Sequence, residues 1–225
     1  MKYSLLLCVF VLSTYLGYAQ STADFNYSVG VKGYTIMQMP KILDQTNKQD
    51  YTHVYLNGGW FKFNDNQISY RFGGSYYRGN VQFDNTCATC EIAKGKVTDY
   101  NFKIGFEKIF NYANVQPYMA FDIGYRSNQY NGVMDSKNNP SMMTSKTVDA
   151  SKTGGVLSPV IGVRINVIPQ VALFGESSLD FFYSYEKQDI STANGTNRIL
   201  NTYKKLETLL NPITVGIQFS FSEKN

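Results

Sequence analysis

The segment "YNFKIGFEKIF", residues 100–110, alternates apolar side chains with polar ones and therefore predicts a β-strand with two different faces. Phe102, Ile104 and Phe106 lie on one face, whereas Lys103 and Glu107 lie on the other. In a water-soluble sheet the apolar face points into a core. In a transmembrane β-barrel the apolar face contacts lipid and the charged face points into the barrel. The segment fits both arrangements, so the rest of the chain has to orient it.

The amino terminus has the pattern of a secretory signal peptide. Lys2 precedes an apolar run, Leu5–Leu12, and small residues follow up to Ala19. A membrane anchor needs about 20 apolar residues, which this run does not supply. We therefore predict cleavage after Ala19, which makes residues 1–19 a signal peptide and residues 20–225 one exported domain.

The exported chain keeps two cysteines, Cys87 and Cys90, in "NTCATCEIAKGK". Export to an oxidising compartment makes a local disulfide the first interpretation. A redox CxxC motif needs a helix start in a thioredoxin-like setting, and a metal site needs further ligands. Neither is visible in the sequence, so we expect no metal and no cofactor.

Alternating segments rich in aromatic and β-branched residues recur along the domain and predict an all-β fold. Each is long enough for a tilted strand to cross a bilayer, which takes about 9 to 11 residues. The predicted strands are Phe25–Met39, Tyr51–Phe63, Ile68–Gly79, Val97–Phe110, Val115–Tyr130, Gly155–Val167, Val171–Tyr185 and Leu209–Phe221.

The connections between these strands alternate in length. Those after the second, fourth and sixth strands are short: residues 64–67, 111–114 and 168–170. Those after the first, third, fifth and seventh strands are long: residues 40–50, 80–96, 131–154 and 186–208. An antiparallel up-and-down transmembrane β-barrel has this asymmetry, with short periplasmic turns and long external loops. A soluble sandwich gives no reason for it. Both chain termini are then expected on the periplasmic side.

The sequence does not decide the orientation of one segment or the secondary structure of another. In the second strand, Leu56 and Trp60 compete with Tyr55 and Phe61 for the lipid-facing side. Residues 198–210 place apolar side chains at helical spacing, so they predict either a short helix in the last loop or an extension of the eighth strand.

The polar faces of the strands carry nearly balanced charge, which suits a closed interior because an unpaired buried charge is costly. Mid-strand glycines lie on the same face and would leave room for long side chains crossing a narrow lumen. The predicted lumen charges are Lys32, Arg71, Lys103, Glu107, Asp122, Arg126, Arg164, Glu176 and Asp180. The glycines are Gly30, Gly73, Gly105, Gly124, Gly162 and Gly216.

Two stretches, "VQPYMAFDIGYR" at residues 115–126 and "PITVGIQFSF" at residues 212–221, complete this pattern. Together with the signal peptide and the alternation of short and long connections, they resemble the eight-stranded outer-membrane β-barrel family of Gram-negative bacteria (OmpA/OmpX-like). The resemblance implies a location in the cell outer membrane, contact with outer-membrane lipids, and assembly by the barrel assembly machinery. A polar tail, residues 222–225, departs from the family's aromatic ending. Family members differ widely in role, so the fold alone does not predict the function.

Lipocalins offer a second interpretation. "GGW" at residues 58–60 and "TDY" at residues 98–100 are similar to lipocalin signatures, and lipocalins are exported eight-stranded barrels with apolar interiors. However, "GGW" lies in the second strand rather than near the first, and no carboxyl-terminal helix follows the last strand.

The functional expectation is a barrel with a plugged, charged lumen that acts as a structural or interaction protein through its external loops, where a protein partner would bind. A narrow passive pore is the alternative. A lipid-modifying enzyme would depend on His53, which has no serine in its immediate sequence neighbourhood, so we expect no enzyme. The formal net charge of +4 and the lack of a basic-aromatic array give no sign of a nucleic-acid partner.

Overall fold

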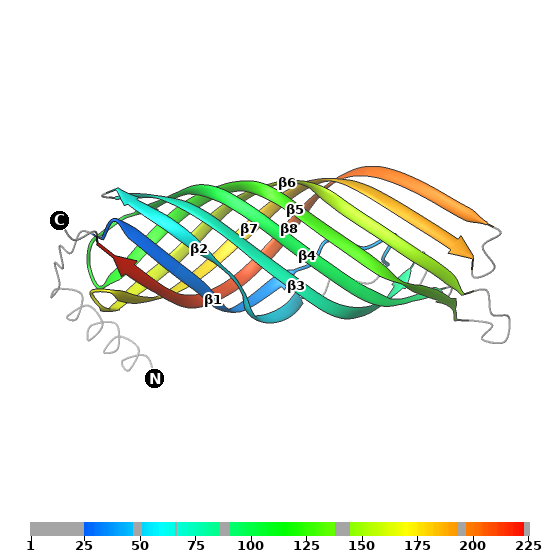
Figure 1. Cartoon of the computed structure of the whole chain (residues 1–225), viewed down its shortest axis with the longest axis horizontal. Helices are drawn as coiled ribbons and strands as arrows, with labels where there is room; N and C mark the ends of the chain where they lie inside the picture. Colours follow the sequence, from blue (N-terminus) through cyan, green and yellow to red (C-terminus); the bar gives the residue numbers. More distant parts are fainter. Residues whose placement is uncertain are drawn as a thin grey trace, which may run out of the picture.

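The computed structural model describes residues 25–46, 51–65, 67–85, 91–137, 145–192 and 197–222. Eight antiparallel strands form a closed barrel in which each strand pairs with the next (Figure 1). They are β1 (Tyr27–Gln38), β2 (Tyr51–Asp65), β3 (Ile68–Asn85), β4 (Glu91–Ile109), β5 (Val115–Ser136), β6 (Lys146–Ile168), β7 (Val171–Thr192) and β8 (Arg198–Phe221). No helix in this described part of the chain is long and apolar enough to cross a membrane.

The ring closes where the first strand pairs with the last. The β1–β8 ladder begins at Tyr27 and Phe221 and extends to Ile36 and Ile213. Every strand therefore has a partner on both sides over this part of the barrel. The predicted up-and-down barrel of eight strands is confirmed, and the described ends of the chain lie at one end of it, beside the short turns (Figure 1).

The short turns lie where the sequence predicts them, but the strands extend farther into the long connections. β3 reaches Asn85 and β4 starts at Glu91, so most of the predicted loop 80–96 is a hairpin. The connections after β5 and β7 are likewise mostly strand. Residues 198–210 belong to β8, so the alternative of a short helix is wrong. Their helical spacing of apolar residues does not produce a helix, because pairing with β7 gives the backbone N–H and C=O groups their hydrogen-bond partners.

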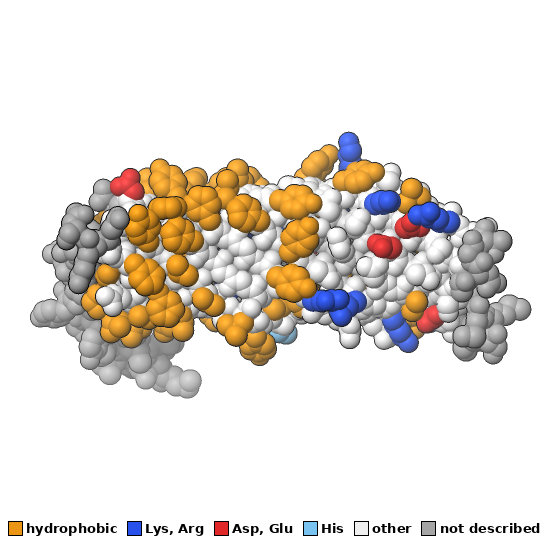
Figure 2. Space-filling model, viewed as in Figure 1, with side chains coloured by type: hydrophobic (Ala, Val, Ile, Leu, Met, Phe, Trp, Pro, Cys, Tyr) orange, Lys and Arg blue, Asp and Glu red, His pale blue; other side chains and the backbone are white. Residues whose placement is uncertain are grey.

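The outer wall near the turns is an apolar belt. Figure 2 shows hydrophobic side chains gathered over this part of the barrel and charged ones over the opposite end. Residues 100–110 of β4 follow this arrangement, because Phe102, Ile104 and Phe106 are exposed while Glu107 is fully buried. The apolar face therefore looks outward, as expected for a strand in lipid.

Beyond the belt the polarity of the wall is reversed. Lys94 and Lys96 of β4 point outward there, whereas Ala93 and Val97 are fully buried. We call this outer end of the barrel the extension. Its interior is an apolar cluster of Ile42, Leu43, Phe83, Ala93, Val97, Tyr130, Met134, Val148 and Ala150. An apolar inside and a charged outside are what a barrel surrounded by water needs.

The segment after β1 closes the extension. β1 and β2 are the shortest strands, with 12 and 15 residues, so the other six rise beyond them. Residues 39–46 fill the space between β3 and β8: the amide of Thr46 donates to Asp84, and the amide of Lys41 donates to Glu207. Leu43 adopts a φ of 55°, and its side chain is buried in the apolar cluster. The segment therefore acts as a plug, a name we keep for residues 39–46.

Irregular pairing settles the ambiguous second strand. The β1–β2 ladder shifts between Lys32 and Tyr34, and Leu56 adopts a φ of 47°, so one extra residue bulges out of β2. As a result, Tyr55 and Leu56 are both exposed, whereas Trp60 points inward.

An arginine in the middle of the apolar belt should destabilise the barrel. Replacing Ile104 by arginine is expected to lower the free energy of unfolding from lipid vesicles by about 2–4 kcal/mol, because the charge would face hydrocarbon. The matched change Lys96→Arg, on the extension of the same strand, should alter it by less than about 0.5 kcal/mol. Urea titration in vesicles measures both. Equal effects would contradict our placement of the belt.

Candidate functional site

The lumen contains the main concentration of buried charged side chains, and Arg71 is its central cation. Arg71 Nη1 lies 3.0 Å from Glu176 Oε1 and 3.3 Å from Glu107 Oε2, and its Nη2 lies 3.0 Å from Asp122 Oδ2. Tyr118 donates a 3.0 Å hydrogen bond to the same Glu176 oxygen. One guanidinium thus joins carboxylates from three other strands across the barrel. We call this set the first ionic layer.

Glu107 collects the remaining cations of the first ionic layer. Lys62 Nζ contacts Glu107 Oε2 directly, and Arg164 Nη1 lies 3.7 Å from Oε1. Lys62 also sits over the Trp60 ring, 3.7 Å from its centre. Lys62 was not among the predicted lumen charges, although its position two residues from Trp60 on the inward face of β2 would have revealed it once that face was known.

A second ionic layer surrounds Asp180. This carboxylate accepts a 2.8 Å bond from Lys103 and a 2.6 Å bond from Ser158, and Arg126 lies 3.7 Å away. Arg126 Nε in turn donates 3.0 Å to Asp99. Asp99 was not among the predicted residues, although it lies an even number of positions from Lys103 and Glu107 and so shares their face.

A third ionic layer lies below the plug. Lys152 Nζ is 2.6 Å from Glu207 and 3.4 Å from Glu186, and it donates a 2.7 Å bond to the carbonyl oxygen of Lys41. Lys205 lies 3.1 Å from Glu186. None of these residues was predicted to face the lumen, because Lys152, Glu186 and Glu207 fall in the predicted long loops.

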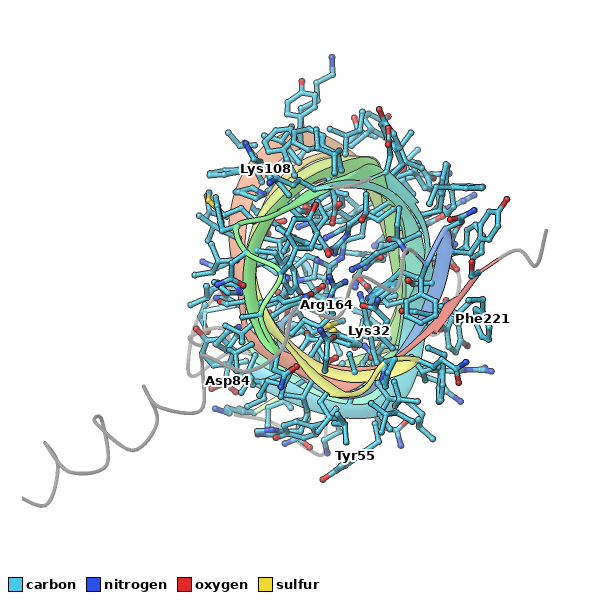
Figure 3. All side chains as sticks on the ribbon, turned by 90° about the vertical axis from the view of Figure 1, so that its left-hand side faces the viewer. Lys32, Tyr55, Asp84, Lys108, Arg164 and Phe221 are labelled. Atoms are coloured by element: carbon cyan, nitrogen blue, oxygen red, sulfur yellow. The ribbon has the colours of Figure 1, made fainter. Side chains whose placement is uncertain are left out.

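The structure places all nine predicted lumen charges inside the barrel and joins eight of them in the first two ionic layers. Figure 3 shows Lys32 and Arg164 within the ring, and Tyr55 and Phe221 outside it. In the part of the chain that the structure describes, no carboxylate lies within salt-bridge distance of Lys32. Cys87 and Cys90 lie outside the described residues, so their disulfide stays a prediction.

Inward glycines make room for large side chains in the lumen. A Cβ added at Gly30 would collide with the Trp60 ring, and one added at Gly162 would collide with the Tyr118 ring. Both rings contact the first ionic layer. Missing side chains on two strands therefore allow aromatic rings to fill the narrow interior.

His53 lies apart from the lumen charges. Its Nδ1 is 2.7 Å from the hydroxyl of Tyr34, and the two rings stack. His53 is exposed on the outer wall, near Tyr55.

In the extension, an exposed ion pair links the last two strands. Arg198 donates to Asp189 and holds the pKa of that carboxylate below its ordinary value.

Comparison with known proteins identifies the fold. No protein-family model and no curated protein matches the chain. The outer membrane protein OprG from Pseudomonas aeruginosa is similar in structure, with a TM-score of 0.58, 11% identity, and coverage of 88% of this chain and 97% of that one. A major outer membrane protein from Thermus thermophilus is similar with a TM-score of 0.51, 11% identity, and coverage of 87% and 99%. The fold is that of a bacterial outer-membrane β-barrel.

This outer-membrane barrel fold agrees with the expected location in the outer membrane and with the apolar belt. The lipocalin interpretation does not fit, because the lumen of the outer-membrane barrel is charged where a lipocalin has an apolar interior. At 11% identity the likeness extends to the fold alone.

Reversing the charge of Glu107 should prevent stable folding. Glu107→Lys would place an ammonium group beside Lys62, Arg71 and Arg164 in a fully buried position. Removing one partner of a buried ion pair costs about 3–5 kcal/mol, and like-charge repulsion adds to this. We expect the variant to remain unfolded in gel-mobility and urea-titration assays.

Glu91→Lys is the matched control, because Glu91 pairs with Lys146 at a partly exposed site of the extension. That change should cost about 1 kcal/mol or less. A Glu107→Lys barrel as stable as the control would show that folding does not depend on the ion pairs of the first ionic layer.

Proposed function

We propose that the protein is a closed, non-conducting barrel of the outer membrane that holds an external interaction surface. The observation that carries this proposal is that buried side chains fill the lumen at successive levels along the barrel. The inward residues of β7 give the order: Glu176 belongs to the first ionic layer, Asp180 to the second, and Glu186 to the third. Buried Phe182 lies between the second and third layers, within an apolar cluster with Val156 and Leu209.

The plug adds a further barrier at the outer mouth. Ile42 and Leu43 are buried among side chains of β3 to β6, and Lys41 is tied to the third ionic layer through its backbone. Steady ion flow needs a continuous water path, which neither an apolar cluster nor a closed salt-bridge layer provides. The plugged barrel is therefore favoured over the narrow pore.

The extension is the part suited to binding a protein partner. β2 pairs with β3 only from Gly58 to Asp65, so the edge of β3 beyond Ser75 is not paired with β2. The part of β8 that precedes Ile213 is likewise not paired with β1. The plug contacts the edge of β3 at Asp84 and that of β8 at Glu207, and strand edges that lack a paired strand recruit extended segments of other proteins. Exposed apolar residues on β8, such as Leu200, add a contact surface beside one of these edges.

The end of β8 supports recognition during assembly. Phe219 and Phe221 are exposed on the outer wall, at the end of the barrel where the strand finishes. We propose that this aromatic ending is read by the barrel assembly machinery, as the resemblance implies.

Refolded protein in planar bilayers should give no steady single-channel current under conditions in which a general porin does. The same protein in liposomes should not permit swelling in small sugars. Steady, reproducible currents from the wild-type chain would contradict the plugged barrel and favour the pore.

The exposed pair of His53 and Tyr34 suits an interfacial aromatic girdle better than a catalytic site. His53→Ala should therefore leave the acyl composition of outer-membrane lipids unchanged when cells expressing either form are compared by lipid mass spectrometry. A lipid product that requires His53 would show that the barrel is an enzyme.

A further inference from the structure

A groove crosses the outer wall at the upper edge of the apolar belt. Its volume is about 620 Å³, and its lining is made by five adjacent strands, β4 to β8. Residues from both the belt and its aromatic border contribute to it, among them Ile104, Phe102, Tyr125, Gly155, Tyr183 and Leu206. It therefore runs from the lipid-facing wall toward the membrane surface.

The groove is built by one row of paired residues. In the ladders, Phe102 pairs with Tyr125, Tyr125 with Gly155, Gly155 with Tyr183, and Tyr183 with Leu206. Gly155 thus lies between two tyrosines. All four flanking side chains are exposed, so the row presents a gap walled by aromatic rings on both sides.

Close packing does not explain the glycine at position 155. A Cβ added there would meet nothing within 4 Å, whereas one added at the neighbouring Gly154 or Gly124 would collide with backbone. The absent side chain leaves open space on the outer wall, at the upper edge of the apolar belt.

Two lysines lie just beyond the groove, on the side away from the belt. Lys204 lies two positions from Leu206 on the outward face of β8, and Lys187 follows Tyr183 and Tyr185 on the outward face of β7. Tyr185 pairs with Lys204 and Lys187 pairs with Thr202, so the two lysines are diagonal neighbours.

Among the described residues, neither lysine lies within salt-bridge distance of a carboxylate. The outward carboxylates Asp149 and Asp189 pair with each other one step farther from the belt, and Asp189 is held by Arg198. Positive charge is therefore available at the membrane surface above the groove.

We propose that the groove and the two lysines form a binding site for a phosphate-bearing lipid of the outer leaflet. One acyl chain would lie between Tyr125 and Tyr183 over Gly155, and the lipid phosphate would sit between Lys187 and Lys204. An apolar slot beside an interfacial cationic pair matches a molecule with an apolar chain and an anionic head group. The site lies on the outer wall, so its occupancy does not depend on whether the lumen conducts.

Native mass spectrometry of the full chain tests this site, with diphosphoryl lipid A as the probe and a diacylglycerol, which has acyl chains but no phosphate, as the comparison. We expect one lipid A molecule to be retained at least tenfold more tightly than the diacylglycerol. Gly155→Leu, whose Cβ would meet no atom within 4 Å, should weaken lipid A binding at least tenfold, and so should the double variant Lys187→Gln with Lys204→Gln.

Matched controls separate this site from general attraction of lipid to the barrel. Ile161→Leu changes an exposed belt residue of β6, and Arg78→Gln with Lys96→Gln removes two outward cations of β3 and β4. Both controls should bind lipid A as the wild type does. Unchanged binding in the Gly155 or the lysine variants, or equal loss in the controls, would overturn the proposal. Gel mobility verifies that every variant is folded.

Discussion

The pairing of β1 with β8 is the constraint on which the rest of the molecule depends. A backbone amide or carbonyl left unpaired in hydrocarbon costs several kcal/mol, so a sheet can cross a membrane only if it has no edge there. The ladder from Tyr27 and Phe221 to Ile36 and Ile213 removes that edge. Outside the belt, past the end of this ladder, the ring is no longer complete. The plug fills the opening, because water permits unpaired edges that lipid does not.

Closing eight strands also fixes what the interior can hold. A ring of this size has room for side chains and little else. Charges that face inward must therefore find partners across the barrel, as Arg71 does with Glu107 and Glu176. The bulky rings of Trp60 and Tyr118 fit only because glycines face them. The closed lumen is thus a direct consequence of strand number together with residue size.

Much of the fold could be predicted from the sequence, because a strand's period of two survives wherever one face meets lipid. The extension could not be predicted, because its polarity is reversed: Val97 is buried while Lys96 is exposed. A short alternation of apolar and polar residues does not reveal which of its two faces points inward. Lys152 was consequently assigned to a loop. Lys62 was missed for a different reason. The bulge at Leu56 places two consecutive side chains outside the wall, and no periodic pattern encodes such a step.

The ionic layers are better understood as determinants of register than as a source of stability. Buried ion pairs often contribute no more than well-packed apolar side chains would, because desolvation offsets their attraction. A one-residue slip of β4, however, would turn Lys103 and Glu107 toward lipid and Phe102 toward the lumen. Each lysine or arginine exposed at the centre of the belt would cost about 2–4 kcal/mol. Charges on the inward face therefore penalise every slip of the ring by an odd number of residues far more than they stabilise the right register.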